Sequence, residues 1–201
     1  MIAIVDYGMG NVGSVRNALR LLGADGVVTS RAEYFERATH IILPGVGAFK
    51  DGMSGLQKNK VLKLLANEVL VKKKPFLGIC LGMQLLADSG EEGGLSNGLG
   101  WIRGRTRRLK VEESKYRLPH IGWDDVEFDA CPLFSGITAR DFYFVHSYFL
   151  EPKNPENIIG TCTYGEKLVA AVQKENIFGV QFHPEKSQKS GLQLLRNFIN
   201  L

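Results

Sequence analysis

The chain has 201 residues, of which 44% are hydrophobic and 23% charged, and its formal net charge at pH 7 is +4. This composition is that of a globular protein that buries a core, and it excludes a disordered chain, a collagen-like repeat and a small disulfide scaffold. No apolar run reaches the length of a membrane span, no signal peptide is visible, and the small positive charge is weak evidence for nucleic-acid binding. We therefore expect one cytoplasmic domain over residues 1–201.

Strands and helices alternate over the first 90 residues. Short apolar runs predict buried strands at Ile2–Asp6, Val27–Val28, His40–Leu43 and Phe76–Ile79. Apolar residues at helical spacing predict helices at Val12–Leu22, Glu33–Ala38, Gly52–Val71 with a break near Asn59, and Leu81–Ala87. Continuous apolar strands between helices are typical of a parallel sheet that is covered on both faces.

The second half of the chain is rich in strands that are joined by short turns. Its predicted strands are Leu99–Val111, His120–Phe128, Asp141–Leu150, Ile158–Thr163, Leu168–Gln173 and Ile177–Phe182. A last amphipathic helix is predicted at Gly191–Ile199. Because no linker separates the halves, we expect an α/β fold with an open, mostly parallel sheet flanked by helices and a strand-rich C-terminal half.

The segment Gly78-Ile79-Cys80-Leu81-Gly82 lies between a predicted strand and a predicted helix. This is the pattern of a nucleophile elbow, with Cys in the place of Ser. The glycines suit a sharp turn, the helix N-terminus favours a thiolate, and the free N–H of Leu81 suits an oxyanion. The alternative is a buried structural cysteine, which we expect for Cys131 and Cys162 because they lack this context. The cysteines and histidines show no zinc spacing, so we expect no metal.

His183 is the candidate base for this nucleophile. It ends a predicted strand, and Glu185 follows two residues later, so both side chains point the same way in an extended chain. A carboxylate beside an imidazole fixes its tautomer, although the pair taken alone also fits a strand end with a surface ion pair. The turn Pro44-Gly45-Val46-Gly47 ends another strand, and its glycines let backbone amides face a ligand.

Three segments resemble the signatures of the triad (class I) glutamine amidotransferases: Pro44–Gly47, Gly78–Gln84 and Gln181–Ser187. Three more resemble one branch of that family, the glutaminase subunits of imidazole glycerol phosphate synthase: Asp6–Asn11, Leu118–Trp123 and Phe142–Tyr148. The resemblance runs from Ile2 to about Leu195. One departure is Asp124, where the resemblance implies Asn; it does not touch the triad.

The resemblance implies that glutamine is hydrolysed to glutamate and ammonia. Cys80 would attack the side-chain amide, His183 would move the proton, and Glu185 would orient His183. The implied oxyanion donors are the backbone N–H groups of Leu81, Val46 and Gly47. The implied substrate-binding positions are Gly45, Gln84, Glu92, His146, Ser147 and Tyr148. For Gln84 the alternative is ordinary helix surface, and for Tyr143–Tyr148 it is the aromatic core of a strand.

One glutaminase domain fills the chain, and no P-loop or dinucleotide fingerprint is present, so we expect no cofactor and a separate ammonia acceptor. The resemblance implies a heterodimer with a (βα)₈-barrel cyclase subunit. That subunit makes imidazole glycerol phosphate and an aminoimidazole carboxamide ribotide in histidine biosynthesis. The expected interface residues are Asn11, His120, Trp123, Tyr143 and Lys186.

Other functions stay open on the sequence. A paralogous amidotransferase would supply ammonia for surface-polysaccharide sugars, and a thiol hydrolase outside the family would use the same elbow. A regulatory subunit would have lost turnover, which the intact Cys80, His183 and Glu185 disfavour. The basic segment Arg103–Lys110 fits a solvated strand edge better than a partner contact, and a nucleic-acid site least of all.

Overall fold

The computed structural model describes residues 1–201, and its centre is an eight-stranded sheet in the order β2-β1-β3-β4-β14-β13-β12-β9. Five neighbouring strands are parallel: β2 (Gly26–Thr29), β1 (Ile2–Val5), β3 (His40–Gly45), β4 (Phe76–Cys80) and β14 (Ile177–Val180). The others extend it in antiparallel pairing: β13 (Glu166–Lys174), β12 (Ile158–Tyr164) and β9 (Glu127–Phe128). The α/β prediction is therefore confirmed.

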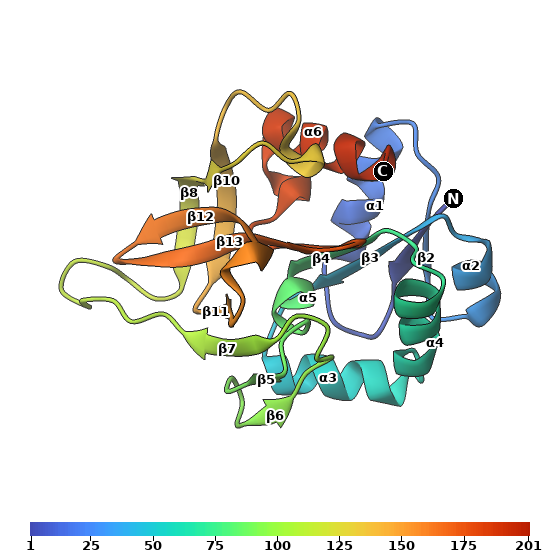
Figure 1. Ribbon diagram of the computed structural model, residues 1–201, viewed down its shortest axis with the longest axis horizontal. Helices are drawn as coiled ribbons and strands as arrows, with labels where there is room; N and C mark the ends of the chain where they lie inside the picture. The colour runs from blue at the N-terminus through green and yellow to red at the C-terminus, as the bar shows by residue number, and fades with distance from the viewer.

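Helices cover both faces of the parallel strands, as continuous apolar strands require. In Figure 1, α1 (Val12–Leu21) and α6 (Gln188–Ile199) lie above the sheet, and α3 (Phe49–Lys58) and α4 (Leu62–Ala66) lie below it. The short helix α2 (Ala32–Arg37) lies beside β2, and α5 (Leu81–Gln84) follows β4 directly. No helix has the length and apolar character that a membrane span needs.

Two smaller sheets are built from residues 89–152. A two-stranded ribbon pairs β8 (His120–Asp125) with β10 (Asp141–His146). A four-stranded sheet has the order β11-β7-β5-β6, with β11 at Tyr148–Pro152, β7 at Gly104–Arg108, β5 at Ser89–Gly90 and β6 at Ser96–Asn97. The two sheets are joined at Ser147, between β10 and β11.

Three predicted strands were too long. Asp141–Leu150 divides at Ser147 because its two parts pair with different strands, β8 and β7. His120–Phe128 divides at Val126, which is fully buried and whose N–H donates to Arg140 O. Leu99–Val111 forms a strand only at β7.

The predicted helix over Gly52–Val71 begins earlier, at Phe49, and is broken after Lys58, close to the break expected near Asn59. Its last part, Asn67–Val71, is a π-helix. Here the carboxylate of Glu68 is buried and forms ion pairs with Lys72 at 2.7 Å and Lys74 at 2.6 Å. These lysines therefore neutralise a buried charge.

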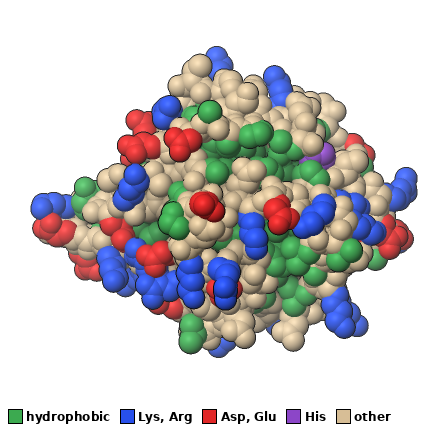
Figure 2. Space-filling view, viewed as in Figure 1, with side chains coloured by type: hydrophobic (Ala, Val, Ile, Leu, Met, Phe, Trp, Pro, Cys, Tyr) green, Lys and Arg blue, Asp and Glu red, His purple; other side chains and the backbone are tan.

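The basic segment forms ion pairs within the chain. Arg107 pairs with Glu151 and Glu166, each at 2.8 Å, and Arg105 pairs with Glu151 at 3.0 Å. Figure 2 shows acidic side chains between the basic ones over this part of the surface. The segment is therefore partly solvated, but β7 is an inner strand that pairs with both β11 and β5, so the predicted strand edge was wrong.

Candidate active site

Cys80 is the last residue of β4, at the point where the chain turns into α5. Its backbone is left-handed, with φ +53° and ψ −110°, a strained conformation for a residue with a Cβ. The turn is tight on both sides: a Cβ on Gly82 would clash with the Leu43 carbonyl oxygen, and one on Gly78 would lie 2.6 Å from Gly82 O. The glycines around Cys80 are therefore sterically required. The helix is shorter than the predicted Leu81–Ala87 and ends at Gln84.

His183 and Glu185 form a buried pair beside this turn. His183 Nδ1 lies 2.8 Å from Glu185 Oε1, and the two side chains are 2% and 1% exposed. Both come from the turn after β14, where Pro184–Lys186 forms a short 3₁₀ helix. His183 Nε2 and Glu185 Oε2 have no hydrogen-bond partner within the chain, so Nε2 is free for a thiol or a leaving group.

The electrostatics of this pair favour a charged imidazole. Burial alone would lower the pKa of His183, but the sulfur of Cys80 and the carboxylate of Glu185 outweigh it and raise the pKa to about 10. A protonated His183 stabilises negative charge on a neighbouring sulfur. Two weak contacts hold Cys80 Sγ: it lies 3.9 Å from Val145 O, and Gln181 Nε2 donates to it at 3.6 Å.

Cys80 opens into a pocket of about 320 Å³. It is lined by nine of the residues that sequence reasoning selected, namely Val46, Gly47, Cys80, Leu81, Gln84, Glu92, His146, Ser147 and Tyr148. Gly45 lies behind the lining, against Tyr7 and Leu81. The pocket also contains Ala48, Pro119 and Val145, which were not selected as site residues although the last two lie within quoted motifs.

The pocket wall is held by a buried amide. Gln84 is 3% exposed, so the alternative of ordinary helix surface is wrong. Its Nε2 donates to Tyr148 O at 2.7 Å and to Gln181 Oε1 at 3.2 Å. Glu92 is half-buried on the same wall, and burial raises the pKa of its carboxyl group despite a backbone hydrogen bond from Phe49. Gln84 therefore fixes the wall, while Glu92 offers a carboxylate to the cavity.

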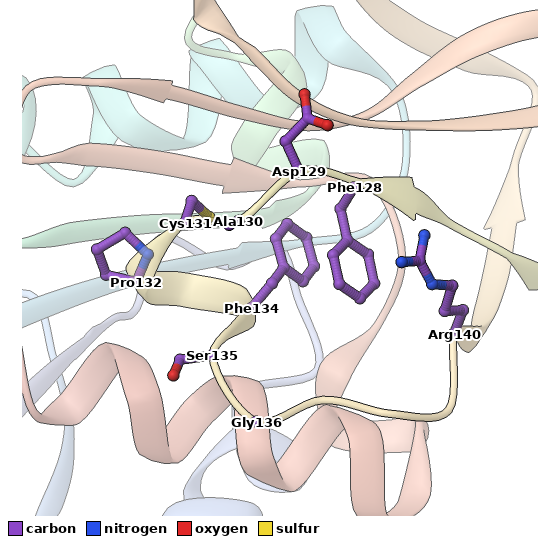
Figure 3. A pocket seen from close by; sticks show the side chains of 9 residues that line it. All are labelled: Phe128, Asp129, Ala130, Cys131, Pro132, Phe134, Ser135, Gly136 and Arg140. Atoms are coloured by element: carbon purple, nitrogen blue, oxygen red, sulfur yellow. The ribbon is translucent and has the colours of Figure 1, made fainter.

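A wider hollow of about 560 Å³ lies away from this site (Figure 3). The rings of Phe128 and Phe134 stack at 4.2 Å, and Arg140 lies over Phe128 at 4.6 Å. Cys131 lines the hollow, whose lining contains no histidine and a single carboxylate, that of Asp129. Cys162 is buried in the core, and burial raises the pKa of its thiol to about 12. Neither cysteine has the surroundings of a nucleophile.

Four of the five predicted interface residues reach the surface, and one does not. Trp123 is 42% exposed and packs edge-on against Tyr143, whose ring lies below Lys186 Nζ at 5.6 Å. Asn11 is half-exposed and caps α1 by accepting from Ser14 N–H. His120 is fully buried, so the expectation of a direct partner contact was wrong for it.

The surface that holds Trp123 also contains Ile121, which is 59% exposed and was not selected from the sequence. Alternation along β8 would have found it, because residues two apart in a strand share a face. On the opposite face of the strand, Asp124 Oδ2 lies 2.6 Å from Nε2 of His120. Asp124, the residue that departs from the family pattern, is 38% exposed, and its carboxylate bonds to the buried ring of His120.

Comparison with known proteins agrees with this geometry. The family model "Glutamine amidotransferase class-I" matches residues 3–201. The chain is 45% identical to "Imidazole glycerol phosphate synthase subunit HisH 2" of Pseudomonas aeruginosa, over 100% of both chains. It is 47% identical to the protein of the same name from Methanococcus maripaludis (99% of this chain, 98% of the relative). It is also 47% identical to subunit HisH of Moorella thermoacetica (100% and 94%).

Solved structures share the fold at low identity. A structure described as a glutamine amidotransferase has a TM-score of 0.76 at 17% identity, covering 100% of this chain and 98% of that one. A structure described as PurLQS from Thermotoga maritima has a TM-score of 0.74 at 17% identity, covering 99% and 97%.

Proposed function

The chain belongs to the class I glutamine amidotransferases, and from this membership we propose that it is the glutaminase subunit of an imidazole glycerol phosphate synthase. It would hydrolyse glutamine and deliver the ammonia to a cyclase subunit in histidine biosynthesis, in the cytoplasm. The relatives that carry this name match over nearly the whole of both chains. Membership also removes the alternative of a thiol hydrolase from outside the family.

The observation that carries the chemistry is the His183–Glu185 pair beside the elbow of Cys80. The Cys80 thiolate attacks the side-chain amide carbon of glutamine, and the proton held on His183 Nε2 goes to the departing ammonia. Glu185 accepts from His183 Nδ1 and keeps Nε2 directed at the reaction. Water then attacks the glutamyl thioester with His183 as base, which releases glutamate and the free thiol.

The negative oxygen of each tetrahedral intermediate needs donors beside Cys80. The N–H of Leu81 lies at the start of α5, and Val46 and Gly47 follow β3, the strand next to β4. Gly47 has φ +99°, a conformation that favours glycine. Removing one such donor raises the barrier by about 3–4 kcal/mol in other enzymes.

The pocket suits a small polar substrate. Its volume of about 320 Å³ lies at the lower end of ligand cavities. We assign the carboxylate of Glu92 to the α-ammonium group of glutamine, because the two charges are opposite and Glu92 is half-buried at the pocket. His146, Ser147 and Tyr148 form the facing wall, and Gly45 supports the oxyanion turn from behind.

The partner that receives ammonia is proposed to be a (βα)₈-barrel cyclase. An exposed surface of Ile121, Trp123, Tyr143 and Lys186 supports a docking site close to the triad, since Lys186 directly follows Glu185. An aromatic pair with an exposed cation has the composition of a binding hot spot. Asn11 would extend this interface.

The test is turnover by the complex of this chain with the cyclase, with either glutamine or ammonium as nitrogen source. Cys80→Ala should abolish the glutamine-dependent reaction and leave the ammonium-dependent one intact, while the control Cys131→Ala should retain both. Addition of the cyclase with its nucleotide should raise the glutaminase rate strongly. Glutamine-dependent synthesis by Cys80→Ala would overturn the proposal.

Two observations favour a second candidate, a paralogue that feeds ammonia to a sugar-modifying barrel enzyme. Several relatives are numbered HisH 1 or HisH 2, and Asp124 departs from the pattern expected for the histidine pathway. Assay against a cyclase of the histidine pathway and against a sugar-modifying partner separates the two. If the chain is the glutaminase subunit of imidazole glycerol phosphate synthase, it must support glutamine-dependent turnover with the cyclase of the histidine pathway.

A further inference from the structure

Two buried histidines connect the wall of the Cys80 pocket to a carboxylate outside it. His146 lines the pocket, and its Nδ1 lies 2.9 Å from Tyr148 O. Its Nε2 lies 3.1 Å from Nδ1 of His120, whose Nε2 lies 2.6 Å from Asp124 Oδ2. We propose that Asp124 and His120 are positioning residues, which hold His146 and the Tyr148 carbonyl at the pocket wall through a row of hydrogen bonds. This row contains one proton more than two neutral imidazole rings would supply.

The proton count follows from the two ends of this row. The carboxylate of Asp124 and the carbonyl of Tyr148 are both acceptors, and three contacts join them through the two rings. Each contact needs one hydrogen, so the complete row needs three. Two neutral imidazoles supply only two. The third proton lies at the Asp124–His120 end, where it makes His120 an imidazolium beside the Asp124 carboxylate. The hydrogen-bonded groups together then carry no net charge.

Water has no access to His120 to replace a missing bond. The ring is fully buried and is stacked between Phe144, at 4.9 Å, and Tyr164, at 3.9 Å between centroids. A buried polar atom without a partner is costly, so the rings are constrained to the geometry of the row. The hydroxyl of Tyr164 is itself used, because it donates to Arg117 O.

The charged groups around the rings place the extra proton at the outer end. Burial lowers the pKa of His120 below its ordinary value, and the hydrogen bond and charge of Asp124 offset this only in part, so the third proton is lost at a lower pH than from a free imidazole. For His146, burial and then the neighbouring His120 and His183 lower the pKa to about 3. The other ionisable neighbours are Cys162, which adjoins Asp124, and the carboxylates of Asp125 and Glu127 near it.

Loss of the third proton changes the pocket wall. His120 then keeps its N–H toward Asp124, since a hydrogen bond to a charged acceptor is the stronger one, and its Nδ1 becomes an acceptor. His146 has one N–H left for two acceptors, His120 Nδ1 and Tyr148 O. The same Tyr148 carbonyl accepts from Gln84 Nε2 at 2.7 Å, so the change also reaches Gln84 in the pocket lining. That this wall binds glutamine rests on the proposed function.

Two substitutions separate the charge of Asp124 from its shape. In Asp124→Asn the amide N–H donates to His120 Nε2, and two neutral imidazoles then complete all three bonds without an extra proton. Asp124→Ala leaves His120 without its outer partner. Asp125→Asn removes the same charge from the next, exposed residue of β8 and is the matched control.

The experiment combines the KM for glutamine, kcat, and ¹⁵N NMR of the histidine side chains in the complex, across pH. We expect Asp124→Ala to raise KM about tenfold, with kcat changed far less, as for loss of one charged hydrogen bond. In the wild type, the signals of His120 and His146 and the KM should change together with pH. Asp124→Asn should keep the low KM and abolish both changes, and Asp125→Asn should behave as the wild type.

An unchanged KM in Asp124→Ala would overturn the proposal, as would the same histidine titration in Asp124→Asn and the wild type. Thermal unfolding of each variant identifies a folding defect, and Asp124→Asn provides the test if Asp124→Ala fails to fold. A wild-type complex that titrates as expected but does not hydrolyse glutamine would contradict only the proposed function.

Discussion

Gly45 and Cys80 are register partners at the carboxyl ends of the neighbouring parallel strands β3 and β4. On the other side of β4 lies β14, whose last residue, Val180, pairs with Ile79, and His183 follows β14. The oxyanion turn, the nucleophile and the base thus come from three adjacent strands at one edge of the sheet. Side chains at this edge converge because parallel strands all end there.

The contact between Gly45 and Tyr7 provides the first prediction. A Cβ on Gly45 would clash with the Tyr7 hydroxyl and lie 2.9 Å from Leu81 Cβ. Gly45→Ala should lower the free energy of unfolding by about 1–3 kcal/mol, as overpacked cores do, and should reduce glutaminase activity by displacing the oxyanion turn. Urea unfolding and steady-state kinetics of the complex measure the two effects.

Tyr7→Phe is the companion change. The Tyr7 hydroxyl is buried without a hydrogen-bond partner, so its removal should stabilise the chain by about 1 kcal/mol or leave it unchanged. In the double variant the cost of Gly45→Ala should fall, because one of the two clashes is gone. Equal costs in the two backgrounds would show that the hydroxyl is not the obstacle. Loss of kcat in a stable Tyr7→Phe would assign the hydroxyl to the active site instead.

The elbow and the buried parallel strands were accessible from sequence because they depend on local patterns. Glycine spacing around Cys80 and the apolar run before it predict a strand, a sharp turn and a helix, and the structure contains each. The same reasoning placed the turn of Val46 and Gly47 beside the Cys80 elbow, because motifs at the ends of parallel strands share an edge, whereas Gln84, Glu92 and His146–Tyr148 were selected through the family resemblance.

The parts that sequence reasoning missed depend on contacts between distant segments. Alternation in β8 and β10 gives no signal that Asp124 bonds to His120 or that His120 bonds to His146. The apolar and aromatic run from Phe142 to Leu150 contains no residue that marks a break, yet it divides at Ser147 because its halves find partners in two sheets. Burial of Glu68 depends likewise on lysines that are brought back by a turn.

The second prediction concerns Glu185. Glu185→Gln keeps the size of the side chain and removes the charge that orients His183, so kcat should fall by roughly 100-fold or more with little change in KM. The pKa of His183 should also decrease, because one of the two groups that raise it becomes neutral. The pH profile of kcat/KM and ¹⁵N NMR of His183 measure these changes.

Glu156→Gln is the matched control, since Glu156 also follows a proline in a 3₁₀ turn but is exposed and distant from the pocket residues. It should be as active as the wild type. A Glu185→Gln variant with full kcat would remove Glu185 from the mechanism.

The third prediction is a loss of stability at alkaline pH. The pKa of His183 is raised from 6.5 to about 10, so the folded state binds this proton more tightly than the unfolded state. Its stabilisation is complete below pH 6.5 and is lost as the pH rises toward 10. Cys80→Ala removes one cause of the raised pKa, so its alkaline loss should be smaller than that of the wild type. Thermal unfolding across this range tests the difference, and identical curves would contradict it.

The fourth prediction compares two arginines of β7 that share the partner Glu151. Arg107 is 13% exposed and also pairs with Glu166, whereas Arg105 is 65% exposed. Arg107→Ala leaves partly buried carboxylates unpaired and should cost about 1–3 kcal/mol of unfolding free energy, and Arg105→Ala less than about 1 kcal/mol. Urea unfolding measures both. An equal loss of unfolding free energy in the two variants would mean that burial does not determine how much these ion pairs contribute to stability.

The last prediction concerns docking through Lys186. Lys186 is exposed, its Nζ lies 5.6 Å from the centre of the Tyr143 ring, and it directly follows Glu185. An acidic group on the cyclase that pairs with Lys186 would connect docking with the triad.

Lys186→Ala should therefore raise the Kd of the complex by up to about tenfold and weaken its salt dependence, because a rim charge contributes mainly to steering and to modest affinity. Lys189→Ala removes an exposed charge from α6, away from the aromatic pair, and should leave the Kd unchanged. Isothermal titration calorimetry at two salt concentrations distinguishes the variants, and an equal Kd for Lys186→Ala and Lys189→Ala would place the docking surface elsewhere.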